Sequence, residues 1–118
     1  MNLPSRHRTK AQEARRAAIY ETPCLACLQL SQRHGRAFCC GAVTEQHTDG
    51  RTKPDAHDKT YALGEWHHLG RTHEGWTRHS MRVEYGPSLA EGSKPFHAAF
   101  GSDDDLLKMQ DDLIGVAA

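Results

Sequence analysis

The sequence lacks any long hydrophobic run. No apolar stretch approaches the roughly 18 residues of a membrane-spanning helix, and the first residues hold no apolar segment of the signal-peptide kind. We therefore expect a cytoplasmic protein. Hydrophobic residues are also scarce, at 37% of 118 residues, with only 7% aromatic. This composition predicts one domain with a small core that needs a staple such as a bound metal ion.

Net charge is absent as well, because 15 Lys and Arg residues balance 15 Asp and Glu residues. The charges are nevertheless unevenly placed: residues 1–20 are basic, whereas residues 101–118 are acidic. Such asymmetry is typical of a basic arm that meets a polyanion. We therefore divide the chain into a basic N-terminal arm and helix (1–20), with Arg15 and Arg16 as candidate nucleic-acid contacts, and a main domain (21–118). The alternative is a solvated surface helix.

The four cysteines are Cys24, Cys27, Cys39 and Cys40. Structural disulfides are rare in a reducing cytoplasm, where a Cys-x-x-Cys pair is more often a metal ligand or a redox motif. The turn from Cys24 to Cys27 lets two thiolates reach one tetrahedral zinc ion. Unligated or regulatory thiols are one alternative. Thiol redox is another, but it requires a βαβ context that the sequence does not show.

The first half of the chain predicts a helix followed by a strand-loop-strand-helix unit. Thr9 to Tyr20 is rich in helix formers, and Thr9 with Gln12 resembles a capping box. Ser31 to Arg36 reads as a loop. Residues 42–48 alternate like a short strand, Asp49-Gly50 signals a turn, a second strand is expected near residues 59–62, and a helix over residues 63–68. The expected fold class is α+β with a ββα outline.

The second half of the chain predicts helices. Trp76, Met81 and Val83 have spacings that suit one buried helical face. Pro95 suits the first position of a short helix that carries Phe96, Ala99 and Phe100. Ser102 is a candidate N-cap, followed by an acidic first turn (Asp103, Asp104 and Asp105) and by Leu106, Met109 and Leu113 on one face. A carboxylate metal cluster is the sharper alternative for the three Asp residues.

Four of the nine histidines lie between Glu45 and His68. A lone histidine is usually a surface or satisfied core residue, but this set falls on a strand end, a loop and a helix. Phosphodiester hydrolysis needs a base of near-neutral pKa and a cation at the phosphate. Imidazole suits the first role, so His47 at the strand end is the candidate base, and His68 on the helix is the candidate metal ligand.

Residues 23 to about 114 resemble the phage-type recombination-enhancement (Ref-like) nucleases of the HNH, or His-Me finger, superfamily. The motifs that carry the resemblance are PCLAC, HTDGRTKPDAH, TYALGEWHH and GPSLAEGSKPFHAAFGSDDDLL. The resemblance implies a small ββα-metal core with flanking helices and a zinc-stapled N-terminal turn. It further implies a phage or prophage protein acting in a bacterial cytoplasm, with a possible dependence on a RecA-type recombinase filament.

The resemblance also implies residue roles. His47 falls at the general base and His68 at the catalytic metal ligand, and His67 falls at a structural zinc ligand beside the Cys-x-x-Cys pair. Relatives have a fourth zinc ligand where this chain has Gly64. Cys39 or Cys40, but not both, is the natural substitute, because a Cys3His set suits zinc.

At the catalytic ion the resemblance places Gln46 where relatives often have His or Asp. An amide oxygen is a weaker ligand than a carboxylate, so either Glu45 assists or the ion is held loosely. His57 is expected to bind the ion, contact phosphate or fix the loop. Arg51 is expected to stabilise the transition state. The alternative is that it is an ordinary solvated loop residue. The remaining expected DNA contacts are Lys53 and Arg71.

The leading hypothesis is a DNA endonuclease that uses Mg²⁺ or Mn²⁺ for catalysis and Zn²⁺ for structure, and that reads its substrate through the backbone. The runner-up is a non-catalytic zinc module that binds DNA or protein. A thiol redox protein is the third hypothesis.

Overall fold

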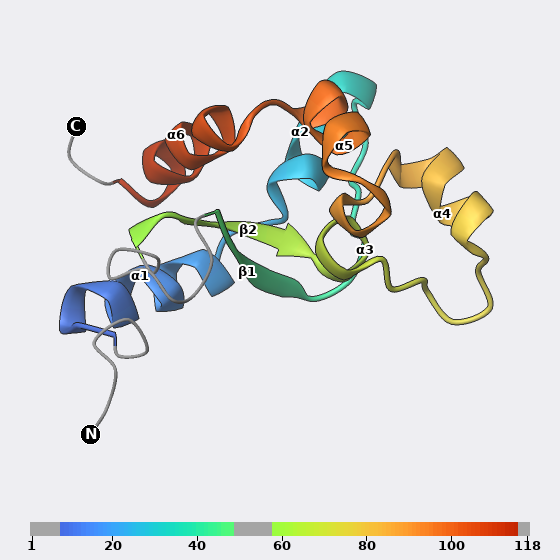
Figure 1. Ribbon diagram of the computed structural model, residues 1–118. Coiled ribbons are helices and arrows are strands. Elements are labelled where there is room, and N and C mark those ends of the chain that lie inside the picture. Colours follow the sequence, from blue (N-terminus) through green and yellow to red (C-terminus); the bar gives the residue numbers. More distant parts are fainter. Residues whose placement is uncertain (1–7, 49–57, 116–118) are drawn as a thin grey trace.

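The structure is a computed structural model that describes residues 8–48 and 58–115. It has the expected α+β composition, with one antiparallel pair of strands among helices (Figure 1). Val43 lies opposite Gly64, and His47 lies opposite Thr60. None of the described helices is long and apolar enough to cross a membrane. The elements are α1 (Lys10–Tyr20), α2 (Leu25–His34), β1 (Val43–His47), β2 (Thr60–Gly64), α3 (Glu65–Leu69), α4 (Arg78–Tyr85), η3 (Leu89–Glu91), α5 (Ser93–Phe100) and α6 (Asp103–Ile114).

Two predicted helix starts are confirmed by their caps. The Thr9 hydroxyl accepts a hydrogen bond from the Gln12 N–H, and the Gln12 side chain accepts one from the Thr9 N–H, so α1 begins with a capping box. The Ser102 hydroxyl caps α6 in the same way through Asp105. The three Asp residues therefore lie in the first turn of α6, where the helix dipole favours negative charge.

The predicted loop at Ser31 to Arg36 is wrong over most of its length, because α2 continues to His34. Leu25 and Leu30 of this helix are buried, and the polar residues read as loop form its last turn, which is exposed at residues 32–34. The helix ends at Gly35, which has a positive φ of 68°. The glycine is thus the helix stop and not part of a longer loop.

The predicted helical core face at Trp76, Met81 and Val83 is also wrong. The Thr77 cap starts α4 one residue after Trp76, which is therefore outside the helix and 41% exposed. Val83 follows Met81 by two positions, or about 200° around a helix, and so turns to solvent, where it is 73% exposed. Only Met81 and Tyr85 of α4 are buried.

Smaller corrections concern helix boundaries and faces. Leu63 and Gly64 belong to β2, and α3 starts only at Glu65. Pro95 is the third residue of α5 and not the first. On α6 Leu106 is buried as predicted, but Leu113 is exposed.

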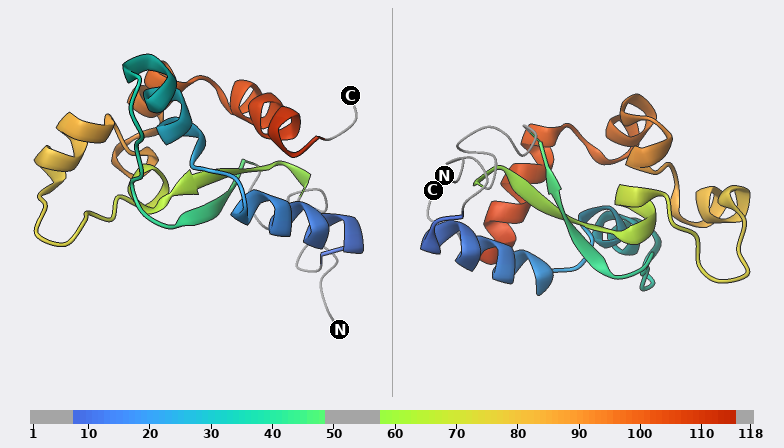
Figure 2. Two further views of the ribbon diagram at one scale, coloured as in Figure 1. Left: turned by 180° about the vertical axis from the view of Figure 1, so that it is seen from behind. Right: turned by 60° about the horizontal axis from the view of Figure 1, so that its bottom comes forward.

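β2 is the centre of the fold, since all five of its residues are buried. α1, α2, α3 and α6 all pack against it, whereas α4 lies at the far end of the molecule from α1 (Figures 1 and 2). The Tyr61 hydroxyl donates to Asp103 Oδ1 at 2.9 Å. The Gln110 side chain accepts a hydrogen bond from the Ala62 N–H at 2.8 Å and donates to the Thr22 hydroxyl at 3.3 Å. These contacts fix α6 along the strand that leads into α3.

Replacing Gln110 by Leu is predicted to destabilise the protein by about 1–3 kcal/mol, because the buried Ala62 N–H loses its acceptor. Urea unfolding measures the change. Lys108→Ala on the exposed side of the same helix is the control and is expected to change stability by no more than about 0.5 kcal/mol. Equal stabilities for the two variants would contradict the role assigned to Gln110.

Candidate functional site

Three cysteines and one histidine converge at a buried site. The donor atoms of Cys24, Cys27, Cys40 and His67 all lie within 4.8 Å of one another. The His67 Nδ1 atom is 3.4 Å from the sulfur of Cys24, 3.6 Å from that of Cys27 and 3.1 Å from that of Cys40. In the part of the chain that the structure describes, this is the one group of three or more such donors.

Three separate segments supply the four donors. Cys24 precedes the first residue of α2 and Cys27 follows one turn later, so both sulfurs face the same side. Cys40 comes from the segment before β1, and His67 comes from α3. The site thus joins the N-terminal part of the chain to the helix that follows the strands.

The orientation of His67 fits metal binding. Its Nε2 atom lies 2.8 Å from the carbonyl oxygen of Tyr85, which can only accept a hydrogen bond. In the neutral ring the proton is therefore on Nε2, and the lone pair of Nδ1 points toward the three sulfurs. A backbone carbonyl that orients a ligating histidine is a common feature of metal sites.

The spacing and donor types fit zinc. With Zn–S bonds of about 2.3 Å and Zn–N bonds of about 2.0–2.1 Å, a tetrahedron places sulfur and nitrogen roughly 3.5 Å apart. The three observed sulfur–nitrogen distances, 3.1–3.6 Å, bracket that value. The residues therefore form a Cys3His group that could hold a zinc ion.

The cysteines shift one another's protonation. Burial alone raises the pKa of Cys24, but hydrogen bonds with Cys27, Cys40 and the Gly64 backbone outweigh it and leave this pKa well below its ordinary value. The hydrogen bond with Cys24 in turn raises the pKa of Cys27, and the one with Cys40 adds to this effect. The group thus favours a buried thiolate, which a cation would compensate.

The sulfur of Cys40 fills the space that a side chain at Gly64 would need. A Cβ atom added at Gly64 would lie 2.5 Å from the Cys40 sulfur and 3.5 Å from the Cys24 Cβ. The backbone of Gly64 has a φ of −71°, so the conformation itself does not demand glycine. Glycine is needed because the sulfur of Cys40 fills the position that a side chain at residue 64 would take. The predicted substitution of the fourth ligand therefore falls on Cys40, while Cys39 is exposed.

His68 points to a different environment from its neighbour His67. Its Nδ1 atom lies 2.6 Å from the Thr44 hydroxyl, which donates its proton to the Leu63 carbonyl at 2.7 Å. The hydroxyl has one proton, so His68 Nδ1–H must be the donor to it. In the neutral ring the lone pair is then on Nε2, as a metal-binding imidazole requires.

The residues of β1 divide between two faces. Side chains alternate along a strand, so Gln46 shares the face of Thr44 and therefore of His68. Glu45 is on the other face, buried against α1, where it pairs with Arg8 at 3.0 Å and Arg16 at 4.0 Å. Glu45 is thus directed away from His68. His47 is the last residue of β1, opposite Thr60.

The expected basic residues have different surroundings. The Arg15 guanidinium is bonded to the Thr60 hydroxyl, the Thr60 carbonyl and Asp111, and only 11% of its side chain is exposed. Arg15 therefore holds α1 to β2 and α6. Arg16 and Arg71 are more open to solvent, although Arg71 also lies 3.3 Å from Glu65. The predicted residues Arg51, Lys53 and His57 lie outside the described residues.

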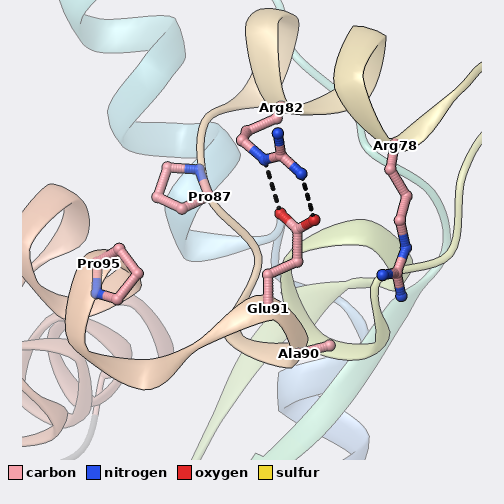
Figure 3. A pocket seen from close by; sticks show the side chains of 6 residues that line it. All are labelled: Arg78, Arg82, Pro87, Ala90, Glu91 and Pro95. Atoms are coloured by element: carbon pink, nitrogen blue, oxygen red, sulfur yellow. Dashed lines mark hydrogen bonds and ion pairs between the residues drawn. The ribbon is translucent and has the colours of Figure 1, made fainter.

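A hollow between α4, η3 and α5 is separate from these residues (Figure 3). Arg82 and Glu91 form two hydrogen bonds in it, at 3.1 and 2.7 Å, and Arg78, Pro87, Ala90 and Pro95 complete the lining. Hydrogen bonding to Arg82 lowers the pKa of Glu91, which keeps both groups charged and paired. This pairing makes the hollow a poor candidate for the metal chemistry predicted here.

Sequence reasoning missed two partners that orient the adjacent histidines. Thr44 could have been predicted, because it is two residues before Gln46 on the same face of the predicted strand. The Tyr85 carbonyl could not have been predicted, because every residue has a backbone carbonyl and the residue type does not show which one accepts a hydrogen bond. Both contacts assign the protonated nitrogen of a candidate ligand.

We predict about one tightly held zinc ion per chain, measured by elemental analysis after gel filtration. Cys40→Ala is expected to lose it, because the site then has three donors, whereas Cys39→Ala is expected to keep it. Equal zinc contents in the two variants would contradict the assignment of Cys40.

A ligand exchange tests the shared position of Gly64 and Cys40. Gly64→Cys alone is expected to lower zinc content and stability, because the new side chain clashes with the Cys40 sulfur. Combining Gly64→Cys with Cys40→Ala is expected to restore both. If the double variant binds no more zinc than Cys40→Ala, the two positions are not equivalent.

Comparison with known proteins places the whole described chain in one group. A family model described as "Recombination enhancement, RecA-dependent nuclease" matches residues 8–115, which include every element from α1 to α6. No curated protein matches the chain. The chain belongs to the family of recombination-enhancement, RecA-dependent nucleases.

Proposed function

We propose that the protein is a divalent-metal-dependent endonuclease that hydrolyses DNA phosphodiester bonds during recombination. Besides the family, the observation that carries the proposal is the pair of histidines on α3. His67 faces the cysteines, whereas His68 is held by Thr44 with Nε2 as its lone-pair nitrogen. Adjacent imidazoles are thus directed to two different tasks, one structural and one suited to a catalytic ion.

The proposed catalytic unit is the ββα-metal core of the HNH, or His-Me finger, nucleases. The order β1, β2, α3 supports it, as does the antiparallel pairing that brings Thr44 opposite Leu63, just before α3. In this unit the zinc site anchors α3 from one side. His68 is then positioned by the strands and not by the metal it binds.

His68 and Gln46 are the proposed protein ligands of the catalytic ion, with His57 as a further candidate. An imidazole nitrogen and an amide oxygen leave most of a coordination shell to water and substrate, which suits Mg²⁺ or Mn²⁺. When bound, the ion would neutralise charge on the scissile phosphate and the leaving oxygen.

His47 is the proposed general base. Imidazole is the side-chain group whose unperturbed pKa is nearest to neutral pH, and His47 lies at the end of β1, next to Gln46. Strand alternation puts Gln46 on the His68 face and His47 on the Glu45 face. The proposed role of His47 therefore requires the backbone to change direction at the strand end, so that the imidazole reaches the bound phosphate. Arg51 is the proposed group that stabilises the charge of the transition state.

DNA is the proposed substrate, contacted through its backbone by Lys53, Arg16 and Arg71. The engagement of Arg15 within the fold removes it from this set. A RecA-type recombinase filament is the proposed partner, on the description of the family.

A second candidate is a zinc module that binds DNA or protein without cutting. Gln46 favours it, because a neutral amide binds a hard cation more weakly than a carboxylate does. The two proposals make different predictions for cleavage but the same prediction for zinc content.

We expect cleavage of plasmid DNA with added Mg²⁺ or Mn²⁺, assayed on duplex, single-stranded and recombinase-coated DNA. His47→Ala should lower the rate by about 10²–10⁴-fold, as loss of a general base does, with zinc retained. His68→Ala should lower it at least as much and raise the concentration of Mg²⁺ or Mn²⁺ required by any residual activity. His79→Ala, an exposed histidine on α4, is the matched control.

If the zinc-loaded parent shows no metal-dependent cleavage of any of the three forms of DNA, the enzyme proposal is wrong. Retained DNA binding in that case would support the zinc module. Normal cleavage by His47→Ala with a loss in His68→Ala would instead remove only the role of His47.

A further inference from the structure

Aromatic rings from two distant segments form a ladder at the α4 end of the molecule. The ladder consists of Phe38, Tyr85, His73 and Trp76. The ring centroid of Tyr85 is 6.2 Å from that of Phe38, 5.4 Å from that of His73 and 6.1 Å from that of Trp76. His73 and Trp76 are themselves 5.1 Å apart, edge to face. Tyr85 is buried and joins the two more exposed ends.

Hydrogen bonds hold the ladder in place. The Tyr85 hydroxyl donates to the Cys39 carbonyl at 2.9 Å, and His73 Nε2 lies 2.8 Å from the same hydroxyl. Since the hydroxyl proton is used, Nε2–H of His73 is the donor to Tyr85. The loop that carries Trp76 is therefore tied to the body of the protein. A ring held in this way loses little freedom when a ligand covers it.

The segments that supply Phe38, His73 and Trp76 are rich in basic residues. RHGRAF (33–38) precedes β1, and RTHEGWTR (71–78) follows α3. The Arg36 guanidinium stacks on Phe38, 4.0 Å from the ring centroid, and is held by Glu84 at 2.9 Å. Basic groups interleaved with aromatic rings are the composition of surfaces that bind single-stranded nucleic acid.

We propose that the aromatic ladder binds unpaired DNA bases by stacking. A duplex hides the faces of its bases, whereas every unpaired base offers a face that Trp76 can stack on. Trp76 is 41% exposed and lies in the segment that begins directly after α3, the helix of His68. The inference rests on the proposed function and deepens it: it names single-stranded DNA as the form that is held by the segment after the candidate catalytic helix.

The two tryptophans make this binding measurable. Trp66 is fully buried, with its indole N–H donating to the Gly86 carbonyl, whereas Trp76 is exposed. Titration of the full chain with single-stranded oligothymidylate, without added divalent ion, should quench the emission of Trp76. A hairpin duplex of equal length should bind at least about tenfold more weakly and quench little. Trp76→Phe should abolish the quench and keep most of the affinity, measured by anisotropy of a labelled strand.

Trp76→Ala should weaken binding of the single strand by about fivefold or more, the loss typical of one stacked base. Val83→Ala, an exposed apolar residue on the neighbouring helix, is the matched control and should bind as the parent does. Equal affinity for single strand and duplex would overturn the inference, as would parental affinity in Trp76→Ala. Single-strand binding without cleavage would support the role of the ladder and contradict only the proposed enzyme activity. Cleavage without single-strand binding would contradict the role of the ladder and support the enzyme activity.

Discussion

The convergence of four donor atoms on one point is the constraint on which the rest of the structure depends. Cys24 and Cys27 come from the start of α2, Cys40 from the segment before β1, and His67 from α3. The chain has too few apolar residues for a large core, and the buried side chains gather around this group. Joining the three segments there brings β2 and α3 into one unit, from which His68 takes its position.

Two neighbouring histidines show how a short helix can serve two environments. His67 and His68 are about 100° apart around α3, so one faces the buried sulfurs and the other faces Thr44 of β1. In each case an oxygen atom accepts a hydrogen bond from one ring N–H, so in the neutral ring the other nitrogen carries the lone pair. The Tyr85 carbonyl does this for His67 and the Thr44 hydroxyl for His68. The five residues of α3 therefore link the zinc-type site to the proposed catalytic site.

Short sequence patterns predicted those features that depend on interactions between residues close together in the chain. The capping boxes at Thr9 and Ser102 fixed the starts of α1 and α6, because a cap forms between residues three apart. The alternation of apolar and polar residues predicted β1. The helical spacing of apolar residues gave a wrong prediction at Trp76, because Trp76 lies one residue before the Thr77 cap and is therefore outside α4. Residues 31–34 of α2 were read as loop because this last turn of the helix is polar and largely exposed, and so shows no apolar periodicity.

The sequence by itself determined the types of donor in the zinc-type group, namely the Cys-x-x-Cys pair and one of two neighbouring histidines. It left open whether Cys39 or Cys40 completes the zinc-type group, because adjacent residues differ only in the direction of their side chains. Tertiary structure decided for Cys40, since its sulfur enters the space that Gly64 leaves empty. It also decided that Arg15 is part of the fold and not of the surface, because its partners Thr60 and Asp111 come from distant elements. The distances between separate segments are set only when the chain folds. These distances identified Cys40 as the fourth donor and Arg15 as a residue of the fold.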